Sequence, residues 1–311
     1  MSEEAAPATF DAVIIGGGPA GLTAAIYLAR SLRSVAVFDC DRPARSDWVQ
    51  VNHNYLGFPA GISIVDLGKR GRAQAEQYGA RFYETEATSI SRLDSEFEVT
   101  AGQHKLCGRA VILATGVTDN WVEFPGYEEF IGRSMHWCIV CDGYEMQGQR
   151  VLVVGDDDHA AQVAMQMVRF TDDVSLLVRM EASEMDRRLR QALSARGIRV
   201  ISGEIATARA REPGVFDAVV LAGGGEIEVD HLFSEQGARP NVALAESLGI
   251  DLTDEGYIRV DTEARTSIAG IYAAGDVTRL FSHQVVTAAH EGATAATSLA
   301  YDLFAAENAI R

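Results

Sequence analysis

Cys138 and Cys141 are the residues whose types and spacing most directly predict chemistry. They stand in the stretch Cys138-Ile139-Val140-Cys141-Asp142-Gly143. Two intervening residues let the sulfurs approach to bonding distance across one turn, so that one thiolate can attack a partner disulfide and its neighbour can resolve the mixed disulfide. One thiol must act as nucleophile and the other as leaving group, so we expect their pKa values to differ. The pattern predicts a redox-active pair.

Two other interpretations of the pair are half of a zinc site and inert buried thiols. A zinc site needs a second pair of Cys or His ligands at a workable spacing. Cys40, Cys107, His136 and His159 do not supply such a pair. Four cysteines in 311 residues are not a disulfide framework either. We therefore predict no metal site, and we expect Cys40 and Cys107 to be small buried apolar residues.

A glycine-rich turn near the start of the chain predicts a nucleotide site. Gly16-Gly17-Gly18-Pro19-Ala20-Gly21 follows the apolar run Phe10–Ile15 and precedes an Ala- and Leu-rich helix expected over Leu22–Leu32. A second strand, Val35–Phe38, ends in Asp39, which completes the dinucleotide-binding unit. In this unit Gly16 allows the tight turn, Gly18 lets a pyrophosphate approach the backbone, and Gly21 permits close helix–strand packing. The helix N-terminus would bind the pyrophosphate, and Asp39 would bind a ribose hydroxyl.

A second strand–turn–helix–strand pattern lies at Arg150–Val178 and has altered turn residues. Where a working site has Gly-x-Gly-x-x-Gly/Ala, this chain has Gly155, Asp157 and Ala160. Asp157 adds a side chain where a pyrophosphate needs bare backbone. A like-charge contact near 4 Å costs about 4 kcal/mol at an effective dielectric constant of ~20. The alternative is that the acids of 156–158 cap the helix and suit its dipole; both interpretations lower phosphate affinity.

The remaining pattern predicts an α/β fold. Further strands are expected at Arg81–Ser91, Glu96–Thr100, Ala110–Ala114, Ile198–Ser202, Ala218–Leu221 and Ile268–Asp276, and further helices at Asp66–Gly79, Asp156–Phe170 and Val285–Phe304. The net charge of −17 argues against nucleic acid and anionic membranes as partners. We see no signal peptide and no apolar run of about 18 residues, so we expect a cytoplasmic protein.

Together these motifs resemble the low-molecular-weight thioredoxin reductase family. The markers are the turn at 16–21, Asn54-Tyr55-Leu56-Gly57-Phe58-Pro59, Ala114-Thr115-Gly116, the stretch 138–143, and 270–276 followed by His283-Gln284-Val285. The resemblance implies two Rossmann-like (three-layer ββα) dinucleotide-binding domains, the second inserted in the first. FAD would occupy a discontinuous domain, 1–118 plus 244–311. The inserted domain, 119–243, would carry the redox cysteines and a degenerate NADPH-type site. A homodimer is also implied.

The resemblance also assigns residue roles. Cys141 would exchange electrons with the flavin, Cys138 would attack the substrate, and Asp142 would protonate the departing thiolate, although Asp142 could instead be a simple helix N-cap. The implied FAD contacts are Gly16, Gly18, Pro19, Ala20, Gly21, Asp39, Cys40, Arg45, Asn54, Ala87, Ala114, Thr115, Gly116, Gly275, Asp276, His283, Gln284 and Val285. The implied second-nucleotide residues are Gly155, Asp157, His159, Ala160 and Arg179.

Three departures from the family pattern bear on the electron donor. The acids at 156–158 replace the glycine turn, and only Arg179 remains where the family has an arginine run for the NADPH 2′-phosphate. His283 stands where the reductases carry Arg, and could titrate near neutral pH or simply pack on FAD. The loop 45–48 also differs, so the FAD contacts there are open, and Trp48 or Trp137 could either shield the flavin or pack ordinarily.

We therefore expect an FAD-dependent disulfide oxidoreductase that does not use NADPH. Its substrate would be a thioredoxin-like protein or a small disulfide or dithiol. Its electron donor would be ferredoxin or a second FAD in the NADPH-type site. The alternatives are an NADPH thioredoxin reductase, a dithiol oxidase that uses oxygen, and a non-enzymatic flavin redox sensor.

Overall fold

The computed structural model describes residues 8–40, 50–179 and 185–308. These residues form two compact units. Unit 1 contains the described residues of 8–40, 65–118 and 239–308, and unit 2 contains those of 50–64, 119–179 and 185–238. The predicted contacts Arg45 and Trp48 lie outside the described residues. The segment 50–64, which the sequence analysis assigned to the FAD-binding part, belongs to unit 2 by its contacts.

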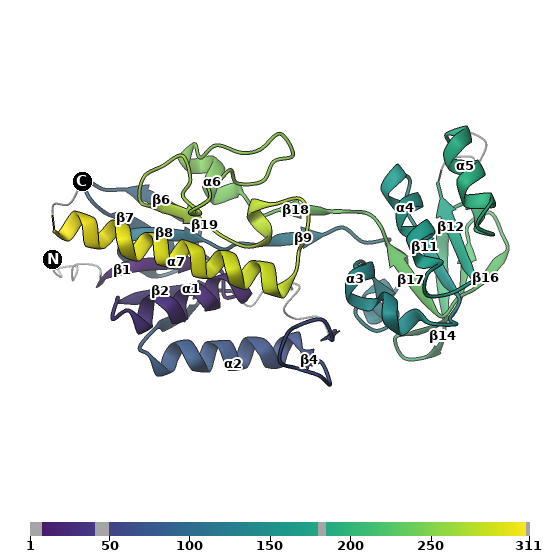
Figure 1. The fold of residues 1–311 in the computed structure, drawn as a ribbon, viewed down its shortest axis with the longest axis horizontal. Coiled ribbons are helices and arrows are strands. Elements are labelled where there is room, and N and C mark those ends of the chain that lie inside the picture. Colours follow the sequence, from purple (N-terminus) through teal and green to yellow (C-terminus); the bar gives the residue numbers. More distant parts are fainter. Residues whose placement is uncertain (1–7, 41–49, 180–184, 309–311) are drawn as a thin grey trace. The chain divides into compact units, whose positions relative to one another are not determined.

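Unit 1 is built on one seven-stranded sheet (Figure 1). Its strands are β1 (Ala8–Ile15), β2 (Val35–Asp39), β5 (Arg81–Glu84), β6 (Ser89–Arg92), β7 (Phe97–Ala101), β8 (His104–Leu113) and β19 (Ile271–Ala273). The strand order is β5-β2-β1-β8-β7-β6, and β19 pairs with β8. Strands β5, β2, β1, β8 and β19 run parallel, whereas β6 and β7 form an antiparallel meander.

Alternate residues of the central strands supply two separate cores in unit 1. Ala12 and Ile14 face helices α1 (Pro19–Arg30) and α7 (Val285–Glu307), which pack against each other (Figure 1). Val13 and Ile15 face the meander and the segment that contains α6 (Ala243–Leu248). Successive side chains of a strand point to opposite faces, so one apolar strand builds both layers. Helix α2 (Ile64–Gln77) also belongs to unit 1, except for its first residue.

Unit 2 repeats the parallel pattern on a smaller scale. Its five-stranded sheet has the order β10-β17-β11-β12-β13, with β10 (Met135–His136), β17 (His231–Ser234), β11 (Val151–Val154), β12 (Val174–Val178) and β13 (Arg199–Ser202). A separate antiparallel sheet contains β14 (Ile205–Glu212), β15 (Val215–Leu221) and β16 (Glu226–Glu228). The helical elements are α3 (Ile139–Asp142), η3 (Gly143–Met146), α4 (Asp158–Met167), α5 (Arg187–Ser194) and η2 (Tyr127–Phe130).

Two short strand pairs complete the described chain. β3 (Val51–Asn52) pairs with β4 (Ile62–Ser63), and β9 (Val117–Asp119) pairs with β18 (Ala238–Pro240). The η4 turn (Asp276–Thr278) follows β19 directly. No helix among the described residues has both the length and the apolar character needed to cross a bilayer.

The two-domain α/β prediction is confirmed, but several predicted element bounds are wrong, and three of the differences have a clear physical reason. The single strand expected over Arg81–Ser91 is two strands with different partners, because β5 joins β2 whereas β6 joins β7. The strand expected over Ile268–Asp276 shortens to β19, since η4 begins directly after the turn at Gly275. The helix expected over Asp156–Phe170 begins only at Asp158, because Asp157 is its N-cap.

Candidate active site

Cys138 and Cys141 form a disulfide in unit 2, with their Cα atoms 5.2 Å apart. Cys138 is the N-cap of the short helix α3, and its carbonyl oxygen accepts hydrogen bonds from the amides of Cys141 and Asp142, each 3.0 Å long. This single turn of helix brings the two sulfurs within bonding distance of each other. Both residues are partly exposed.

Asp142 directly follows Cys141 in the chain and is buried, with 7% of its surface exposed. Its carboxylate oxygens accept hydrogen bonds from the Gln50 side-chain amide at 2.9 and 3.1 Å. Asp142 precedes η3, but its side chain caps no backbone amide there, so the alternative role as a simple N-cap is not observed. The nearby side chain of Asn54, a predicted FAD contact, donates instead to the Val140 carbonyl oxygen at 3.4 Å. Trp137 packs edge-on against Trp121.

The glycine turn of unit 1 has the geometry expected of a dinucleotide site. Gly16 has φ +110°, and a Cβ atom there would overlap the carbonyl group of Ala114. A Cβ on Gly21 would overlap the Gly16 carbonyl oxygen, so the helix packs directly on the turn. A Cβ on Gly18 would meet nothing within 4 Å. The open side of the turn is therefore at Gly18, where a pyrophosphate would approach.

Asp39 and the start of α1 complete this turn. The Gly17 amide donates to Asp39 Oδ1 at 3.0 Å, so the acid at the end of β2 lies against the glycine turn. No side chain of the described residues caps the first turn of α1. The amides after Gly18 thus remain available for an anion. These features fit FAD, whose pyrophosphate the turn would hold.

A second turn of unit 1, at Gly275 and Asp276, is held from α7 by a residue that the sequence analysis missed. Glu291 accepts hydrogen bonds from the Gly275 amide at 2.7 Å and from Thr278 Oγ1 at 3.2 Å, and it forms an ion pair with Arg279. Glu291 therefore positions the predicted FAD contact Asp276. The available signal was an acid inside an Ala-rich helix, which cannot be buried without partners.

The other predicted FAD contacts occupy defined places in unit 1. Thr115 Oγ1 donates to the Asn241 carbonyl oxygen at 2.7 Å, and Gly116 has φ +64°. His283 Nε2 lies 2.8 Å from the Arg279 carbonyl oxygen, so its ring is bonded to backbone. Of the remaining contacts, Ala87 and Ala114 are buried, Gln284 is the N-cap of α7, and Pro19, Ala20 and Val285 begin helices α1 and α7. The expectation of burial is wrong for Cys40, which is partly exposed because it follows the end of β2, and is confirmed for Cys107 inside β8.

The second nucleotide-type turn keeps the strand–helix geometry but fills its own helix N-terminus. Asp157 is the N-cap of α4, and its Oδ1 accepts a hydrogen bond of 2.9 Å from the Ala160 amide. Asp156 accepts a hydrogen bond of 2.7 Å from the Arg179 amide and forms an ion pair with its guanidinium group. A Cβ on Gly155 would lie 2.6 Å from the Ala160 Cβ. Gly155 thus serves close packing, while Asp157 satisfies an amide that a phosphate would use.

Glu235, another residue that the sequence analysis missed, adds a further carboxyl group at this turn. It directly follows β17, and its side chain lies 3.5 Å from Nε2 of the predicted site residue His159. Burial, reinforced by the negative charge of Asp157, raises the pKa of Glu235 to about 8. Glu235 is therefore neutral at pH 7, and ionises only in alkaline solution.

This pKa predicts a pH-dependent stability. Because the folded protein holds a proton on Glu235 that the unfolded chain releases near pH 4.5, the contribution of Glu235 to stability is complete below pH 4.5 and is lost as the pH rises to about 8. At about 1.4 kcal/mol per pKa unit, Glu235→Gln should reduce the loss of unfolding free energy between pH 5 and 9 by roughly 2–4 kcal/mol. Denaturant titrations at both pH values measure it, with the exposed Glu204→Gln as control. Equal losses in wild type and Glu235→Gln would contradict it.

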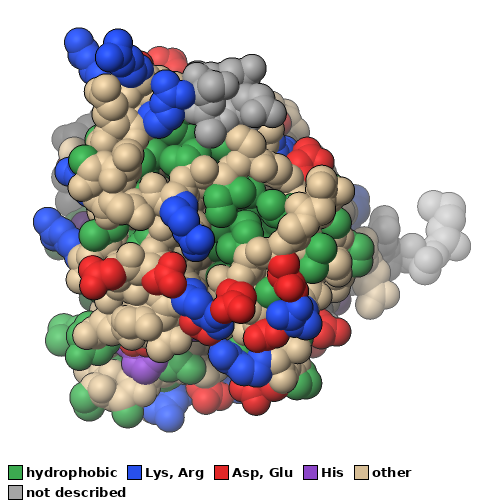
Figure 2. All heavy atoms as spheres, turned by 90° about the vertical axis from the view of Figure 1, so that its right-hand side faces the viewer, with side chains coloured by type: hydrophobic (Ala, Val, Ile, Leu, Met, Phe, Trp, Pro, Cys, Tyr) green, Lys and Arg blue, Asp and Glu red, His purple; other side chains and the backbone are tan. Residues whose placement is uncertain are grey.

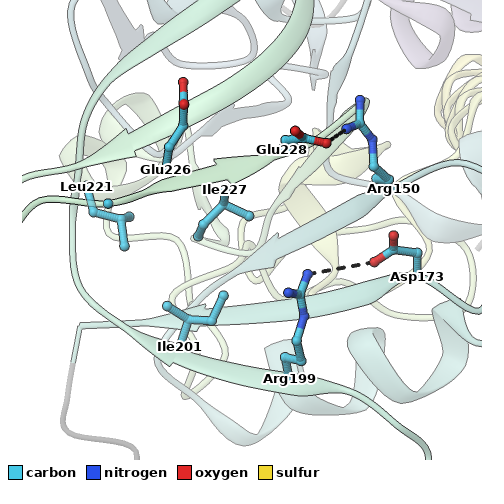
Figure 3. Close-up of a pocket in the computed structure, with 9 residues that line it drawn as sticks. Arg150, Asp173, Arg199, Ile201, Leu221, Glu226, Ile227 and Glu228 are labelled. Carbon is cyan, nitrogen blue, oxygen red and sulfur yellow. Dashed lines mark hydrogen bonds and ion pairs between the residues drawn. The ribbon is translucent and has the colours of Figure 1, made fainter.

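Unit 2 also contains a pocket of about 460 Å³ (Figure 3). Ile201, Leu221 and Ile227 form its apolar wall. Its two arginines already have acidic partners, because Arg150 pairs with Glu228, and Arg199 pairs with Asp173 at 3.8 Å. None of the sequence-predicted site residues lines this pocket, and we assign it no part in the redox site.

The charged side chains of the face shown in Figure 2 are mixed. Lys and Arg gather toward the top of that view, and Asp and Glu alternate with them lower down, around apolar side chains. Among the described residues, no group of three or more His, Cys, Asp or Glu side chains is arranged to hold a metal ion.

Comparisons with known proteins bear on the whole chain. The family model described as pyridine nucleotide-disulphide oxidoreductase matches residues 10–293. A thioredoxin reductase of Treponema pallidum is 31% identical over 94% of this chain and 96% of its own length. The NADPH-dependent thioredoxin reductase 3 of Arabidopsis thaliana is 33% identical over 92% of this chain and 57% of its own length. The crystal structure of a thioredoxin reductase from Streptococcus pyogenes superposes with a TM-score of 0.89 at 28% identity, covering 96% of this chain and 100% of that one.

Proposed function

Because the chain belongs to the pyridine nucleotide-disulphide oxidoreductase family and is a thioredoxin-reductase-like flavin disulfide oxidoreductase, we propose that it reduces the disulfide of a thioredoxin-like protein. The observation that carries this proposal is the partly exposed Cys138–Cys141 disulfide with the buried acid Asp142 directly after it in the chain. The thioredoxin reductases of Treponema pallidum and Streptococcus pyogenes, which match over nearly the whole of both chains, support the class of substrate.

The reduced cysteines would perform the exchange in two steps. The Cys138 thiolate attacks the substrate disulfide, which forms a mixed disulfide and releases one substrate thiol. The Cys141 thiolate then attacks the Cys138 sulfur, which restores the Cys138–Cys141 bond and releases the second substrate thiol. Asp142 donates a proton to the departing thiolate and regains one afterwards. Two electrons and two protons thus pass from the protein dithiol to the substrate.

FAD would be held in unit 1 by the turn at Gly16–Gly21, with Asp39 and Asp276 as further contacts. When bound, it supplies two-electron exchange with the protein disulfide. The side chains of this chain contribute the rest: Gly18 leaves backbone amides accessible, and Glu291 fixes the turn before Asp276.

NADPH is the first candidate for the electron donor. The Arabidopsis relative carries NADPH in its name, and NADPH independence, which the sequence analysis preferred, gains no support from the relatives. Ferredoxin and a second FAD gain none either. An NADPH thioredoxin reductase, which the sequence analysis gave as an alternative, is therefore better supported than the NADPH-independent enzyme that it preferred.

A donor without a pyrophosphate remains the second candidate because of one observation. Asp157 occupies the α4 N-terminus, and Asp156 adds a second carboxylate to the same turn. A pyrophosphate would have to displace the Asp157 cap and approach these groups.

We predict that Asp157→Gly raises the affinity for NADPH at least about tenfold, which corresponds to about 1.4 kcal/mol. Removing one carboxylate relieves a like-charge contact worth up to about 4 kcal/mol near the surface. Stopped-flow reduction of the bound flavin over a range of NADPH concentrations measures this, with Asp172→Asn, an exposed acid of the same unit, as the charge-matched control.

The wild-type trace of the same experiment separates the two donors. Flavin reduction by NADPH at the rate of turnover supports the first candidate. No reduction in wild type together with rapid reduction in Asp157→Gly supports the second. An unchanged affinity in Asp157→Gly would show that the α4 cap does not oppose the nucleotide.

A further inference from the structure

Two histidines of unit 2 lie behind Asp142 and have no part in the function described so far. β10 and β17 are neighbouring parallel strands, and His136 is in register with Phe233. His231 lies two residues before Phe233, so its side chain is on the same face of the sheet as that of His136. The two rings meet there, with His136 Nε2 3.1 Å from His231 Nδ1.

His136 also reaches toward the acid that follows the disulfide. Its Nδ1 lies 3.6 Å from Asp142 Oδ2, and this nitrogen is buried without a hydrogen-bond partner. His136 and Asp142 are both buried, whereas His231 is partly exposed. The three side chains therefore form a row that leads from solvent to the interior, and Gln50 bonds to the Asp142 carboxylate at its inner end.

The row can hold its proton in two arrangements without a charged ring. In the first, Asp142 is ionised, His136 carries its proton on Nδ1, and His136 Nε2 accepts from His231 Nδ1. In the second, Asp142 is protonated and donates to His136 Nδ1, and His136 Nε2 donates to His231 Nδ1. The single ring N–H proton of His231 is then on Nε2. Both histidines are neutral in each arrangement, since a neutral imidazole has one donor and one acceptor nitrogen.

The surroundings of His231 favour these neutral rings. Burial and the neighbouring His136 lower the pKa of His231 to about 4, against the opposing effect of Asp230 and Asp142. The charged groups that act on it are Asp230, Arg211 and Asp142. Asp230 is itself bonded to Arg150, at 3.0 Å, and to Arg211, at 3.3 Å, which limits its attraction for an imidazolium ion.

We propose that His231 and His136 form a proton relay between solvent and Asp142, which reloads the acid that serves the Cys138–Cys141 pair. The relay takes one element from the proposed function, namely that Asp142 donates a proton to the departing thiolate. Both histidines act through Asp142 and are positioning residues in this sense.

The proton balance of one reduction follows from the two arrangements. An external dithiol attacks the protein disulfide, a sulfur–sulfur bond breaks, and the departing thiolate takes the proton of Asp142. The second attack releases the oxidised reagent and leaves the other cysteine, which takes a proton from solvent or from the reloaded acid. The donation starts with both rings carrying their proton on Nδ1, so it leaves the first arrangement. To reload Asp142, His231 Nε2 then accepts a proton from water, His231 Nδ1 passes its proton to His136 Nε2, and His136 Nδ1 passes its proton to Asp142, which gives the second arrangement. Both rings return to their Nδ1–H tautomers by proton exchange with solvent before they reload Asp142 again.

The test measures reduction of the Cys138–Cys141 disulfide in the flavin-bound full chain by dithiothreitol at pH 7. Samples are quenched with acid, alkylated and analysed by mass spectrometry, so the readout is the thiol content of the pair rather than turnover. The variants are His231→Ala, which removes the relay, and His231→Asn, whose side-chain amide can occupy the place of Nδ1 and bond to His136 but cannot pass a proton on. His290→Asn, at an exposed position of α7, is the control.

We expect both His231 variants to slow reduction about tenfold, less than the ~100-fold or more that a direct general acid contributes, because water can partly replace the relay. Free imidazole should restore the rate of His231→Ala and leave that of His231→Asn unchanged. A wild-type rate in His231→Asn would overturn the proposal, since the hydrogen bond alone would then suffice, and so would a wild-type rate in His231→Ala.

The outcome is separable from that of the proposed function. Dithiothreitol acts on the disulfide directly, so the relay is measured whether or not the reduced pair passes electrons to a thioredoxin-like protein. Failure of wild type to reduce that protein would overturn the proposed function and leave the comparison of the His231 variants intact.

Discussion

Replacing either Cys138 or Cys141 by serine should lower reduction of a thioredoxin-like protein at least ~1,000-fold, as expected when a covalent catalytic unit loses one member. Each sulfur has an indispensable step, because one must attack the substrate and the other must release it. Turnover measured with the purified flavoprotein and a thioredoxin-like disulfide tests this. Cys107→Ala, at a buried position of β8 away from the disulfide motif, is the matched control.

The two serine variants should also differ from each other. Cys141→Ser keeps the proposed nucleophile Cys138, so it should accumulate a stable mixed disulfide with the substrate, visible as a mass increase that dithiothreitol removes. Cys138→Ser should not. Accumulation in Cys138→Ser alone would reverse the roles of the two sulfurs, and turnover above a few per cent of wild type in either variant would exclude the dithiol exchange.

The second large effect is expected at the glycine turn of unit 1, where two neighbouring glycines should respond differently. Gly21→Ala places a Cβ against the Gly16 carbonyl oxygen, so α1 must move away from β1. We expect a loss of roughly 3 kcal/mol in unfolding free energy, the upper end of the usual cost of overpacking. Thermal and denaturant unfolding of the flavin-bound protein measure it.

Gly18→Ala is the informative counterpart. The new methyl group meets no protein atom within 4 Å, and the Gly18 φ of −73° suits any residue. We therefore expect unfolding of the flavin-free protein to be unchanged within about 0.5 kcal/mol, while FAD binding weakens because the methyl group lies where the pyrophosphate approaches. Normal FAD affinity in Gly18→Ala would show that the cofactor is held elsewhere.

Much of the fold was predictable because its signals are local. The apolar runs at 10–15 and 174–178 are buried on both faces and read directly as strands. The turn at 16–21 was predicted because Gly16 needs a positive φ and Gly21 packs directly against the Gly16 carbonyl group, and both demands select glycine. By contrast, β14 was missed because its residues are mostly exposed and include three charged side chains. Its strand character comes from pairing with β15.

The site was predictable only as far as its motifs reach. The cysteine pair and the acid after it share one short stretch, so their proximity needs no knowledge of the fold. Glu235 and His231 could not be assigned, because each acquires its partner from a separate strand or helix end. The prediction of an electron donor other than NADPH gains no support from the relatives, which favour NADPH. The altered turn residues at 155–160 show a change in local chemistry, and that change alone does not identify the donor.

The discontinuity of unit 1 implies an order of folding. β19 pairs with β8, and α7 packs on α1, across most of the length of the chain, whereas nearly all of unit 2 is one uninterrupted segment. Contacts between distant residues form late because their loops are costly to close. During synthesis we therefore expect unit 2, which carries the cysteine pair, to fold first. The apolar face of α1 stays exposed until the C-terminal helix α7 has been synthesised. A truncated chain that ends before α7 should accordingly retain a folded redox unit and aggregate through unit 1.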